Sequence, residues 1–374
     1  MLLTFQMDQS LTIVHTEAST GWGGQEKRIF SEMLALRERG HHPSVITAQD
    51  AALAKHCANA QFPTYEVSFK RSDYLRSFRR ISQRFKELHP DVVNTHSSRD
   101  GYLAAAAARW TNVPALIRSR HIDVDYPQRS ISRIAYYHLA DHVLTTSNRI
   151  RNRLSKQLSI PIERISNIPT GIDVQTFDPS SADRDKFRNE LKLQPHTKLV
   201  GQVSVLRSWK GHRILIQAIS QLKDLEDLYW VFVGEGPMRQ LLEEDIRSYG
   251  LEDRITLAGH REDIPDVLAA LDYVVLASTG HEGVPQVVLQ AQAMERLVIA
   301  TEVGGIPEVV EHGVTGLLTE PNHPQALADA LRVAFQDPEH AREIGKRARK
   351  SVGSNYSLSK MVDTLESLYS RLLT

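Results

Sequence analysis

Two series of short apolar runs alternate with helical stretches, and this rhythm constrains the fold more than any other feature of the chain. The first series contains LTIVHT, HPSVITA, DVVNTHS, PALIRSRH and HVLTTS, and the second contains KLVGQVSVL, YWVFVGEG, RITLAG, YVVLAS and LVIATE. Strands rich in Val and Ile that alternate with helices are typical of parallel sheets covered by helices. The sequence therefore predicts an α/β fold with two doubly wound domains.

The rhythm breaks at NIPTGIDVQTFDPSSADRD, where Pro, Gly, Ser and Asp cluster. Such clusters mark turns and linkers, so we expect two domains that join near residues 169–190. We place these domains at residues 1–175 and 176–355. The last stretch, SLSKMVDTLESLYSRLL, has an apolar stripe at helical spacing, which predicts that a helix at 356–374 packs back onto the first domain.

Composition excludes several classes of protein. The chain has one cysteine, Cys57, so it has no internal disulfide framework, and it has no apolar run long enough to span a bilayer. The first residues lack the basic region of a signal peptide, and we expect a cytoplasmic protein. Net charge is zero, although Lys and Arg outnumber Asp and Glu by 23 to 18 over residues 1–183. That excess is too weak to indicate nucleic-acid binding, but it favours an anionic ligand or membrane surface near the first half.

Ligands of open parallel sheets bind at the carboxyl ends of the strands, so the loops there form the candidate site. One such loop, HEGVPQVVLQAQA, follows the run YVVLAS. Pro285 suits the first turn of a helix, where the dipole and the amides of Gly283 and Val284 favour an anion. Glu282 would repel a bare phosphate but can accept hydrogen bonds from sugar hydroxyls, and Gln290 can also bond a hydroxyl. The alternative is a solvated loop acid and a surface glutamine.

Two further loops offer groups for phosphate. VLRSWKGH follows the first strand of the second domain, and its Lys210 and Arg207 precede a helix, which suits a diphosphate; the alternative is a solvated basic loop. The loop STGWGGQEKRI contains Gly23 and Gly24, which let the backbone approach a ligand closely. This loop has neither the spacing of a dinucleotide fingerprint nor the Lys-Ser/Thr of a P-loop.

Two histidines and two aspartates stand near the strand ends of the first domain. His96 ends DVVNTH and His121 ends PALIRSRH, so each could face a ligand; the alternative is a structural or merely exposed histidine. Asp123 and Asp125 form an Asp-x-Asp that could hold a divalent cation. No second ligand set accompanies this pair, and we interpret it as incidental.

The stretch SFKRSDYLRSFRRISQRFKELHP predicts a basic amphipathic helix. Its apolar stripe contains Leu75, Phe78, Ile81, Phe85 and Leu88, and its basic face contains Arg76, Arg80 and Arg84. One interpretation is a core-packed helix with a solvated basic face. The other is a patch for an anionic membrane or lipid phosphate.

The order of these loops resembles that of one family. A Gly-rich first loop, a strand-end His, a linker, a Lys-Gly, GEGP, AGH, Glu-Gly-Val-Pro and EVGGIPEVVEHGVTGLL follow one another. This order is similar to that of the family 4 glycosyltransferases of GT-B fold over nearly the whole chain, most specifically from Gly259 to Leu318. The resemblance implies two Rossmann-like domains with a nucleotide sugar in the cleft, held mainly by the second domain. It also implies transfer with retention of anomeric configuration, without a metal or other cofactor.

The resemblance further implies roles for individual residues. Glu282 would hold donor-sugar hydroxyls, Lys210 would bind the diphosphate, and His121 would lie beside the donor sugar. The remaining matches are Gly283, Val284 and Pro285 for the turn that faces sugar and phosphate, His260 and Arg261 beside the nucleotide base, and Gly23 and Gly24 near the diphosphate and acceptor.

Two positions depart from the family pattern. Gln290 stands where a second glutamate usually grips the ribose hydroxyls, so we expect weaker ribose binding. An arginine is usual five residues before the lysine, and here that place is Val205. Arg207 would substitute for it from three residues before Lys210.

The sequence thus predicts a retaining glycosyltransferase that uses a UDP-, GDP- or ADP-sugar. The acceptor would be a glycan or lipid-linked molecule of surface polysaccharide or lipopolysaccharide assembly, met at the inner face of the cytoplasmic membrane. His96, Arg76 and Arg80 are acceptor-side candidates. Two alternatives stay open: a nucleotide-sugar epimerase of the same fold, and a non-catalytic nucleotide-sugar binder that serves as a partner subunit.

Overall fold

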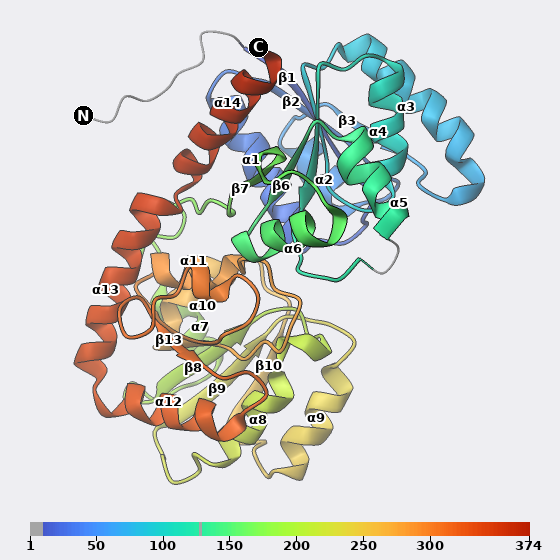
Figure 1. Cartoon of the computed structure of the whole chain (residues 1–374). Coiled ribbons are helices and arrows are strands. Elements are labelled where there is room, and N and C mark those ends of the chain that lie inside the picture. The colour runs from blue at the N-terminus through green and yellow to red at the C-terminus, as the bar shows by residue number, and fades with distance from the viewer. Residues whose placement is uncertain (1–9, 127–128) are drawn as a thin grey trace. The chain divides into compact units, whose positions relative to one another are not determined.

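The computed structural model describes residues 10–126 and 129–374. The chain forms two compact units. The first unit comprises Met1–Gly171 and Leu358–Thr374, and the second comprises Ile172–Ser357. Each unit is built on one parallel sheet covered by helices, as the sequence predicted (Figure 1).

The first unit contains a seven-stranded sheet in the order β3-β2-β1-β4-β5-β6-β7. Its strands are β1 Thr12–Glu17, β2 His42–Ala48, β3 Thr64–Val67, β4 Val92–Thr95, β5 Ala115–Arg120, β6 His142–Thr145 and β7 Ile165–Asn167. The five predicted strands are confirmed. The sequence did not predict β3 and β7, because four- and three-residue edge strands have too few apolar positions for a local pattern.

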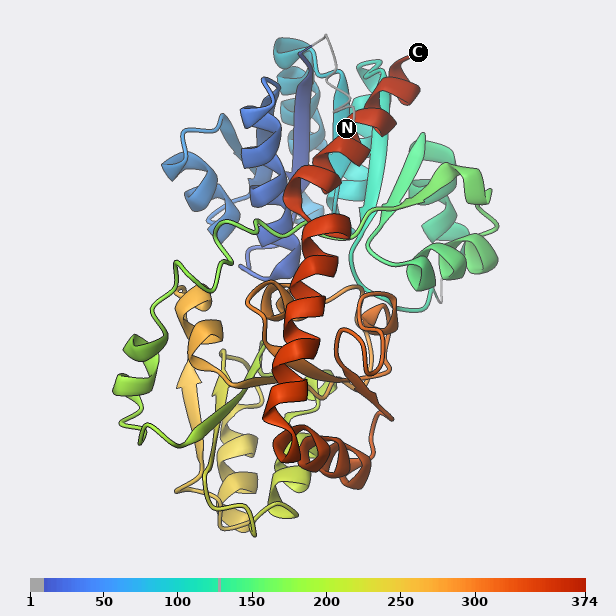
Figure 2. The same ribbon diagram turned by 90° about the vertical axis from the view of Figure 1, so that its left-hand side faces the viewer.

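Helices cover both faces of this first sheet because successive residues of its strands face opposite sides. Ile13 of β1 lies in a core with residues of α1 and of the C-terminal helix α14, whereas Val14 lies in a second core with residues of α3 and α4. Figure 2 shows α14 in red beside the elements of this unit. The helices are α1 Gly24–Glu38, α2 Ala52–Asn59, α3 Tyr74–Leu88, α4 Asp100–Trp110, α5 Arg129–Arg133, α6 Asn148–Leu158 and α14 Leu358–Leu373.

One prediction about α3 is wrong. Leu75 was placed in the buried stripe, but its side chain is 65% exposed, whereas Ile81 and Phe85 are buried. Leu75 precedes Ile81 by six residues, and roughly 100° per residue turns it about 120° away from the core-facing side. Ser77 faces the core instead and donates to the carbonyl of Ser68 at 2.6 Å.

The second unit contains a six-stranded parallel sheet in the order β10-β9-β8-β11-β12-β13. Its strands are β8 Lys198–Val203, β9 Leu228–Val233, β10 Ile255–Gly259, β11 Tyr273–Leu276, β12 Leu297–Thr301 and β13 Leu317–Thr319. The five predicted strands are confirmed, and only the three-residue edge strand β13 was not predicted.

The helices of the second unit include one that the sequence assigned to the linker. Asp183 caps α7 by accepting from the amides of Asp185 and Lys186, and Phe187 is buried in the core. The stretch 169–190 is therefore not linker throughout. The helices are α7 Arg184–Glu190, α8 His212–Ser220, α9 Arg239–Ser248, α10 Ile264–Ala270, α11 Gln286–Ala293, α12 Pro324–Gln336 and α13 Pro338–Asn355. Over the residues that the structure describes, no helix is long and apolar enough to cross a bilayer.

The strand orders locate a switch point in each sheet. Chain order reverses between β1 and β4 in the first unit and between β8 and β11 in the second. At such a point the two following helices leave the sheet on opposite faces, and the loops at the carboxyl ends are free to hold a ligand. The loops after β8 and β11 carry Lys210 and Glu282, respectively.

Candidate active site

The switch point of the second sheet brings Lys210 and Glu282 together. β8 pairs with β11 in parallel, so the loops after these strands emerge at the same edge. Lys210 ends a short 3-10 helix at Ser208–Lys210, and its Nζ lies 2.6 Å from Oε1 of Glu282. The two side chains are only 14% and 7% exposed. The sequence predicted both residues, and the sheet order explains why they meet.

A second donor, the hydroxyl of Ser278, binds the Glu282 carboxylate oxygen that Lys210 contacts. Ser278 donates its Oγ–H to the same oxygen, Oε1, at 2.6 Å. The other oxygen, Oε2, has no donor among the residues that the structure describes. One carboxylate oxygen is thus held by the protein, and the other remains free to accept from a ligand hydroxyl.

Gln202 ties the two loops together from inside the sheet. Its side chain is fully buried on β8, where it donates to the carbonyl of Lys210 at 2.7 Å and accepts from the amide of Ala277 at 3.2 Å. Sequence reasoning missed this residue. A polar side chain within the apolar run LVGQV was the available signal, because a buried amide must find partners.

Two glycines allow the loops to approach. Gly211 has φ +70°, and a Cβ there would lie 1.7 Å from the carbonyl oxygen of Ala277. Gly304 has φ +60°, and a Cβ there would lie 2.0 Å from the carbonyl oxygen of Glu282. The amide of Gly305 then donates to the carbonyl of Gly283 at 3.0 Å. The backbone on both sides of the Lys210–Glu282 pair is therefore tightly packed.

The turn after Glu282 leads into the N-terminus of α11. The helix begins at Gln286, and Pro285 lies at its N-cap. The sequence predicted Pro285 in the first turn, one position further into the helix. The amides of Gly283 and Val284 have no acceptor within residues 10–126 and 129–374. Free amides at the positive end of a helix dipole are suited to bind an anion.

The chain matches two families of known proteins. Residues 22–176 match the family described as Glycosyltransferase Family 4, and residues 183–351 match that described as Glycosyl transferases group 1. The chain is 31% identical over 304 residues to the D-inositol 3-phosphate glycosyltransferase of Corynebacterium glutamicum, and the match covers 75% of this chain and 72% of that one.

The chain is a family 4 glycosyltransferase.

This glycosyltransferase is also similar, over most of its length, to one further sequence relative and to one solved structure. It is 27% identical to the UDP-Gal:alpha-D-GlcNAc-diphosphoundecaprenol alpha-1,3-galactosyltransferase of Escherichia coli, with 75% of each chain covered. A crystal structure of a glycosyltransferase from Rickettsia africae superposes with a TM-score of 0.89 at 25% identity and covers 98% of this chain and 99% of its own. The predicted GT-B fold is thus confirmed.

The side chains of Arg207 and Gln290 lie near the switch point without joining the Lys210–Glu282 pair. Arg207 is exposed, and its guanidinium carbon lies 5.3 Å from the centre of the Trp209 ring. Gln290 is half-buried on α11, and its side chain has no hydrogen-bond partner in the described part of the glycosyltransferase. The roles of Arg207 at a diphosphate and of Gln290 at a ribose stay predictions.

His260 and Arg261 follow β10 and differ in their exposure and their contacts. His260 is exposed. The Arg261 guanidinium makes four hydrogen bonds, two to Asp263 and two to Glu190, and stacks on the Phe187 ring at 4.6 Å. These bonds raise the pKa of Arg261 and hold that of Asp263 well below its usual range. Arg261 thus ties α7 to the β10 loop, and its place beside a nucleotide base stays a prediction.

In the first unit, Gly23 and Gly24 begin α1 and are exposed. The amide of Gly23 donates to Oε2 of Glu26 at 2.8 Å, which caps the helix. Gly23 has φ −110°, so its backbone requires no glycine. The proximity of both residues to a ligand stays a prediction.

His96 and His121 are neighbours, and a third histidine joins them. His96 is buried, and its two ring nitrogens lie 3.0 Å from His15 and 3.0 Å from His121. Both ring nitrogens of His96 thus have histidine partners, and its role on the acceptor side stays a prediction. His121 is only partly buried. Sequence reasoning missed His15, because it lies within a strand and not at its end.

The two acids of the Asp-x-Asp motif are paired with arginines. Asp123 pairs with Arg149 and Arg153, each at 2.8 Å, and Asp125 pairs with Arg153 at 2.7 Å. The arginines supply the positive charge that these two carboxylates face, so the pair does not by itself indicate a divalent metal ion. Arg76 and Arg80 are exposed on α3.

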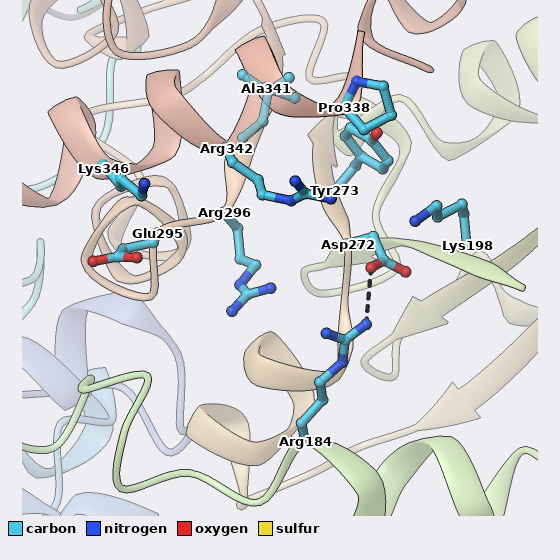
Figure 3. Close-up of a pocket in the computed structure, with 11 residues that line it drawn as sticks. Arg184, Lys198, Asp272, Tyr273, Glu295, Arg296, Pro338, Ala341, Arg342 and Lys346 are labelled. Carbon is cyan, nitrogen blue, oxygen red and sulfur yellow. Dashed lines mark hydrogen bonds and ion pairs between the residues drawn. The ribbon is translucent and has the colours of Figure 1, made fainter. Parts of the chain in front are cut away.

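A pocket of about 260 Å³ lies at the opposite edge of the second sheet (Figure 3). It is lined by the beginnings of β8, β11 and β12 and by α13, and it contains none of the predicted site residues. Asp272 within it is already paired with Arg184 at 3.0 Å and with Arg188 at 3.3 Å. Since ligands of such sheets bind at the carboxyl edge, we assign the site to the Lys210–Glu282 loops and not to this pocket.

Proposed function

We propose that this glycosyltransferase moves a sugar from a nucleoside-diphosphate sugar, a UDP-, GDP- or ADP-sugar, to a glycan or lipid-linked acceptor with retention of anomeric configuration. The observation that carries the proposal is the Lys210–Glu282 pair beside the free amides of Gly283 and Val284. A cation and free amides suit a diphosphate, and a carboxylate beside them suits sugar hydroxyls.

Lys210 would stabilise the leaving group. The bond from the anomeric carbon to the phosphate oxygen breaks, and negative charge grows on the nucleoside diphosphate. An ammonium group has three N–H donors, so Lys210 can keep its bond to Glu282 and still donate to a phosphate oxygen. Arg207 and the N-terminus of α11 would add to this stabilisation, and we propose that no metal ion or other cofactor is required.

Glu282 would position the sugar. Its Oε1 is held by Lys210 and Ser278, which fixes the direction of the free Oε2. A hydroxyl of the donor sugar would donate to Oε2. Positioning of this kind lowers the barrier because the reacting carbon is held in one orientation as the bond breaks.

Retention follows if the acceptor attacks from the face that the phosphate leaves. The bond between the acceptor oxygen and the anomeric carbon then forms on that face, and the acceptor proton passes to the leaving phosphate. No protein base is needed for this step. In the first unit, we propose His121 as a hydrogen-bonding group for a sugar substrate.

We further propose a role in surface polysaccharide or lipopolysaccharide assembly at the inner face of the cytoplasmic membrane. The E. coli relative, as its name states, acts on a diphosphoundecaprenol-linked sugar, and this supports a lipid-linked acceptor. On α3, Arg76 and Arg80 are exposed, and Leu75 is 65% exposed. The ring of Trp110, 69% exposed, packs on Phe78 of that helix. Exposed apolar side chains beside arginines suit weak contact with an anionic bilayer.

The test is transfer from a panel of nucleotide sugars to lipid-linked and free glycan acceptors. Lys210→Ala and Glu282→Ala should each lower turnover about 100-fold or more on the donor that the wild-type enzyme uses. Lys198→Ala is the matched control, because Lys198 begins the same strand, β8, at its opposite end. If both site variants keep wild-type turnover, the site assignment is wrong. Conversion of the donor without any acceptor would indicate an epimerase, and donor binding without transfer would indicate a partner subunit.

A further inference from the structure

Three histidines from three adjacent strands form a continuous row in the first unit. His15 lies on β1, His96 directly follows β4, and His121 directly follows β5. In the parallel register His15 lies beside Asn94, two residues before His96, so each step of the row moves toward the carboxyl edge. Side chains two residues apart share a face of a sheet, which explains why the three rings meet.

The rings form a hydrogen-bonded chain. Nδ1 of His15 lies 3.0 Å from Nε2 of His96, and Nδ1 of His96 lies 3.0 Å from Nε2 of His121. Neighbouring rings lie edge to edge, with centroids 5.3 Å apart and planes within 21° and 20° of each other, as an in-plane hydrogen bond between ring nitrogens requires. The backbone amide of His96 donates to Asp100 at 2.8 Å, which holds the backbone that carries the middle ring. We call these three residues the histidine chain.

A buried glutamate faces the inner end of the histidine chain. Oε1 of Glu32 lies 3.9 Å from Nε2 of His15. Tyr369 of α14 donates its hydroxyl to the same oxygen at 3.4 Å, and Nε of Arg28 lies 3.7 Å from the other oxygen. At the outer end, Nδ1 of His121 has no hydrogen-bond partner among the described residues.

These contacts couple the tautomers of the three rings. Burial lowers the pKa of His15, His96 and His121, the last two strongly, so all three rings are neutral near neutral pH. A neutral imidazole has one N–H and one lone pair, so both hydrogen bonds can form only if all three protons are on Nε2 or all three are on Nδ1. Nε2 of His15 has no hydrogen-bond partner among the described residues and lies 3.9 Å from the Glu32 carboxylate. In the first arrangement this nitrogen carries the proton, which the negative charge of the carboxylate attracts. In the second it carries a lone pair, which that charge repels.

We propose that Glu32 acts through His15 and His96 to hold the Nε2–H tautomer of His121, so that Nδ1 of His121 is presented as a hydrogen-bond acceptor. Glu32, His15 and His96 are then positioning residues. The value of that acceptor rests on the proposed function: it suits a substrate hydroxyl, which can donate to it, and it disfavours a phosphate oxygen, which cannot.

The direct test is ¹⁵N NMR of the full chain with ¹⁵N-labelled histidine and no substrate, with the His121 signals identified by their loss in His121→Asn. We expect protons on Nε2 of all three rings, with through-hydrogen-bond couplings from Nε2 to the Nδ1 of the next ring. A proton on Nδ1 of His121, or no coupling between the rings, would overturn the proposal. The tautomers are measured on the unsubstituted protein, and His121→Asn serves only to identify the His121 signals.

Glu32→Gln tests the role of the charge. We expect a second population of His121 with its proton on Nδ1, three rings away from the substitution, and about a tenfold loss of kcat/KM if that nitrogen binds a sugar hydroxyl. Glu366→Gln is the matched control, because Glu366 is also buried and also contacts a histidine, His41, at 3.0 Å, outside the histidine chain. An unchanged His121 tautomer in Glu32→Gln would show that Glu32 does not set it. The tautomer is measured without substrate, so the two proposals are tested separately. The proposed tautomer can be refuted in a protein that transfers sugar, and it can be confirmed in a protein that does not.

Discussion

Nζ of Lys210 lies 2.6 Å from Oε1 of Glu282, although the two residues are 72 positions apart and belong to loops after different strands. The pair is nearly buried, so neither charge is fully solvated. A buried ion pair contributes little net stability, but the loss of one partner is costly because it strands the other charge. The pair therefore allows stability and activity to be separated by mutation.

Lys210→Ala should lower the free energy of unfolding by about 2–3 kcal/mol, because the Glu282 carboxylate then lacks its countercharge. The double variant Lys210→Ala, Glu282→Gln should regain most of that loss, because a neutral amide tolerates the site. Transfer activity should stay lost in both variants. Denaturant titration and turnover on the same samples measure the two effects, and a double variant as unstable as Lys210→Ala would contradict the charge argument.

Gly211→Ala should destabilise the second unit by about 3 kcal/mol or more, because its Cβ would overlap the carbonyl of Ala277. Gly313→Ala is the matched control: Gly313 has φ +76°, similar to the +70° of Gly211, but nothing lies within 4 Å of an added Cβ. That control should lose only about 1–2 kcal/mol, the usual cost of the left-handed conformation. Equal losses in thermal unfolding would mean that the close approach of the loops is not strained.

Gln290→Glu should tighten binding of the nucleotide-sugar donor if this side chain faces ribose, because a carboxylate accepts hydrogen bonds more strongly than an amide. A charge-assisted bond contributes about 1 kcal/mol more than a neutral one, so we expect roughly a fivefold gain in calorimetry. Gln194→Glu, an exposed change of the same charge, should have no effect. Unchanged affinity in Gln290→Glu would mean that residue 290 does not contact the donor.

Stability should fall as pH is lowered from 7 to 5. Burial lowers the pKa of His142 to about 4, and burial with nearby Lys210 lowers that of His212 to about 3. The unfolded chain binds these protons near pH 6.5, so acid favours unfolding by about 2 kcal/mol for each of the two histidines at pH 5. The histidine chain acts in the same direction.

Buried carboxyls oppose this trend. Burial, with the charge of Asp100, raises the pKa of Glu17 to about 7, so the folded chain binds that proton first and regains about 2 kcal/mol on acidification from pH 7 to 5. Asp100 is shifted upward as well. Five histidines with a lowered pKa outweigh two acids with a raised pKa. His212→Gln should remove about 2 kcal/mol of the pH dependence in denaturant titrations.

The double variant Arg76→Gln, Arg80→Gln should bind anionic vesicles roughly 30-fold more weakly than the wild-type protein. Each arginine near an anionic surface contributes about 1 kcal/mol to binding. Binding by the wild-type chain should fade with added salt because the attraction is screened. Arg247→Gln with Arg342→Gln, two exposed changes in the second unit, controls for net charge. Equal binding of the wild-type chain to neutral vesicles would rule out the electrostatic contact.

The two sheets and most of their strands could be predicted from the sequence because strand and helix periodicities are local. Strands buried on both faces, such as LVIAT, are continuously apolar, and the loops that follow them end in Gly, Pro or polar residues. The edge strands β3, β7 and β13 were missed because three or four residues contain too little pattern. Leu75 was misplaced because it was grouped with Ile81, although it lies about 120° around the helix from that buried residue.

The sequence by itself thus determined the fold class, the family and the loops that carry Lys210 and Glu282. Only the tertiary structure decided which groups meet, because contact across a sheet depends on strand order and register, which no local pattern encodes. The switch point between β8 and β11 brings Lys210 to Glu282. It also places Gln202 against the carbonyl of Lys210 and Ser278 against the Glu282 carboxylate. The register of β1, β4 and β5 likewise turns two strand-end histidines and one mid-strand histidine into a single hydrogen-bonded row.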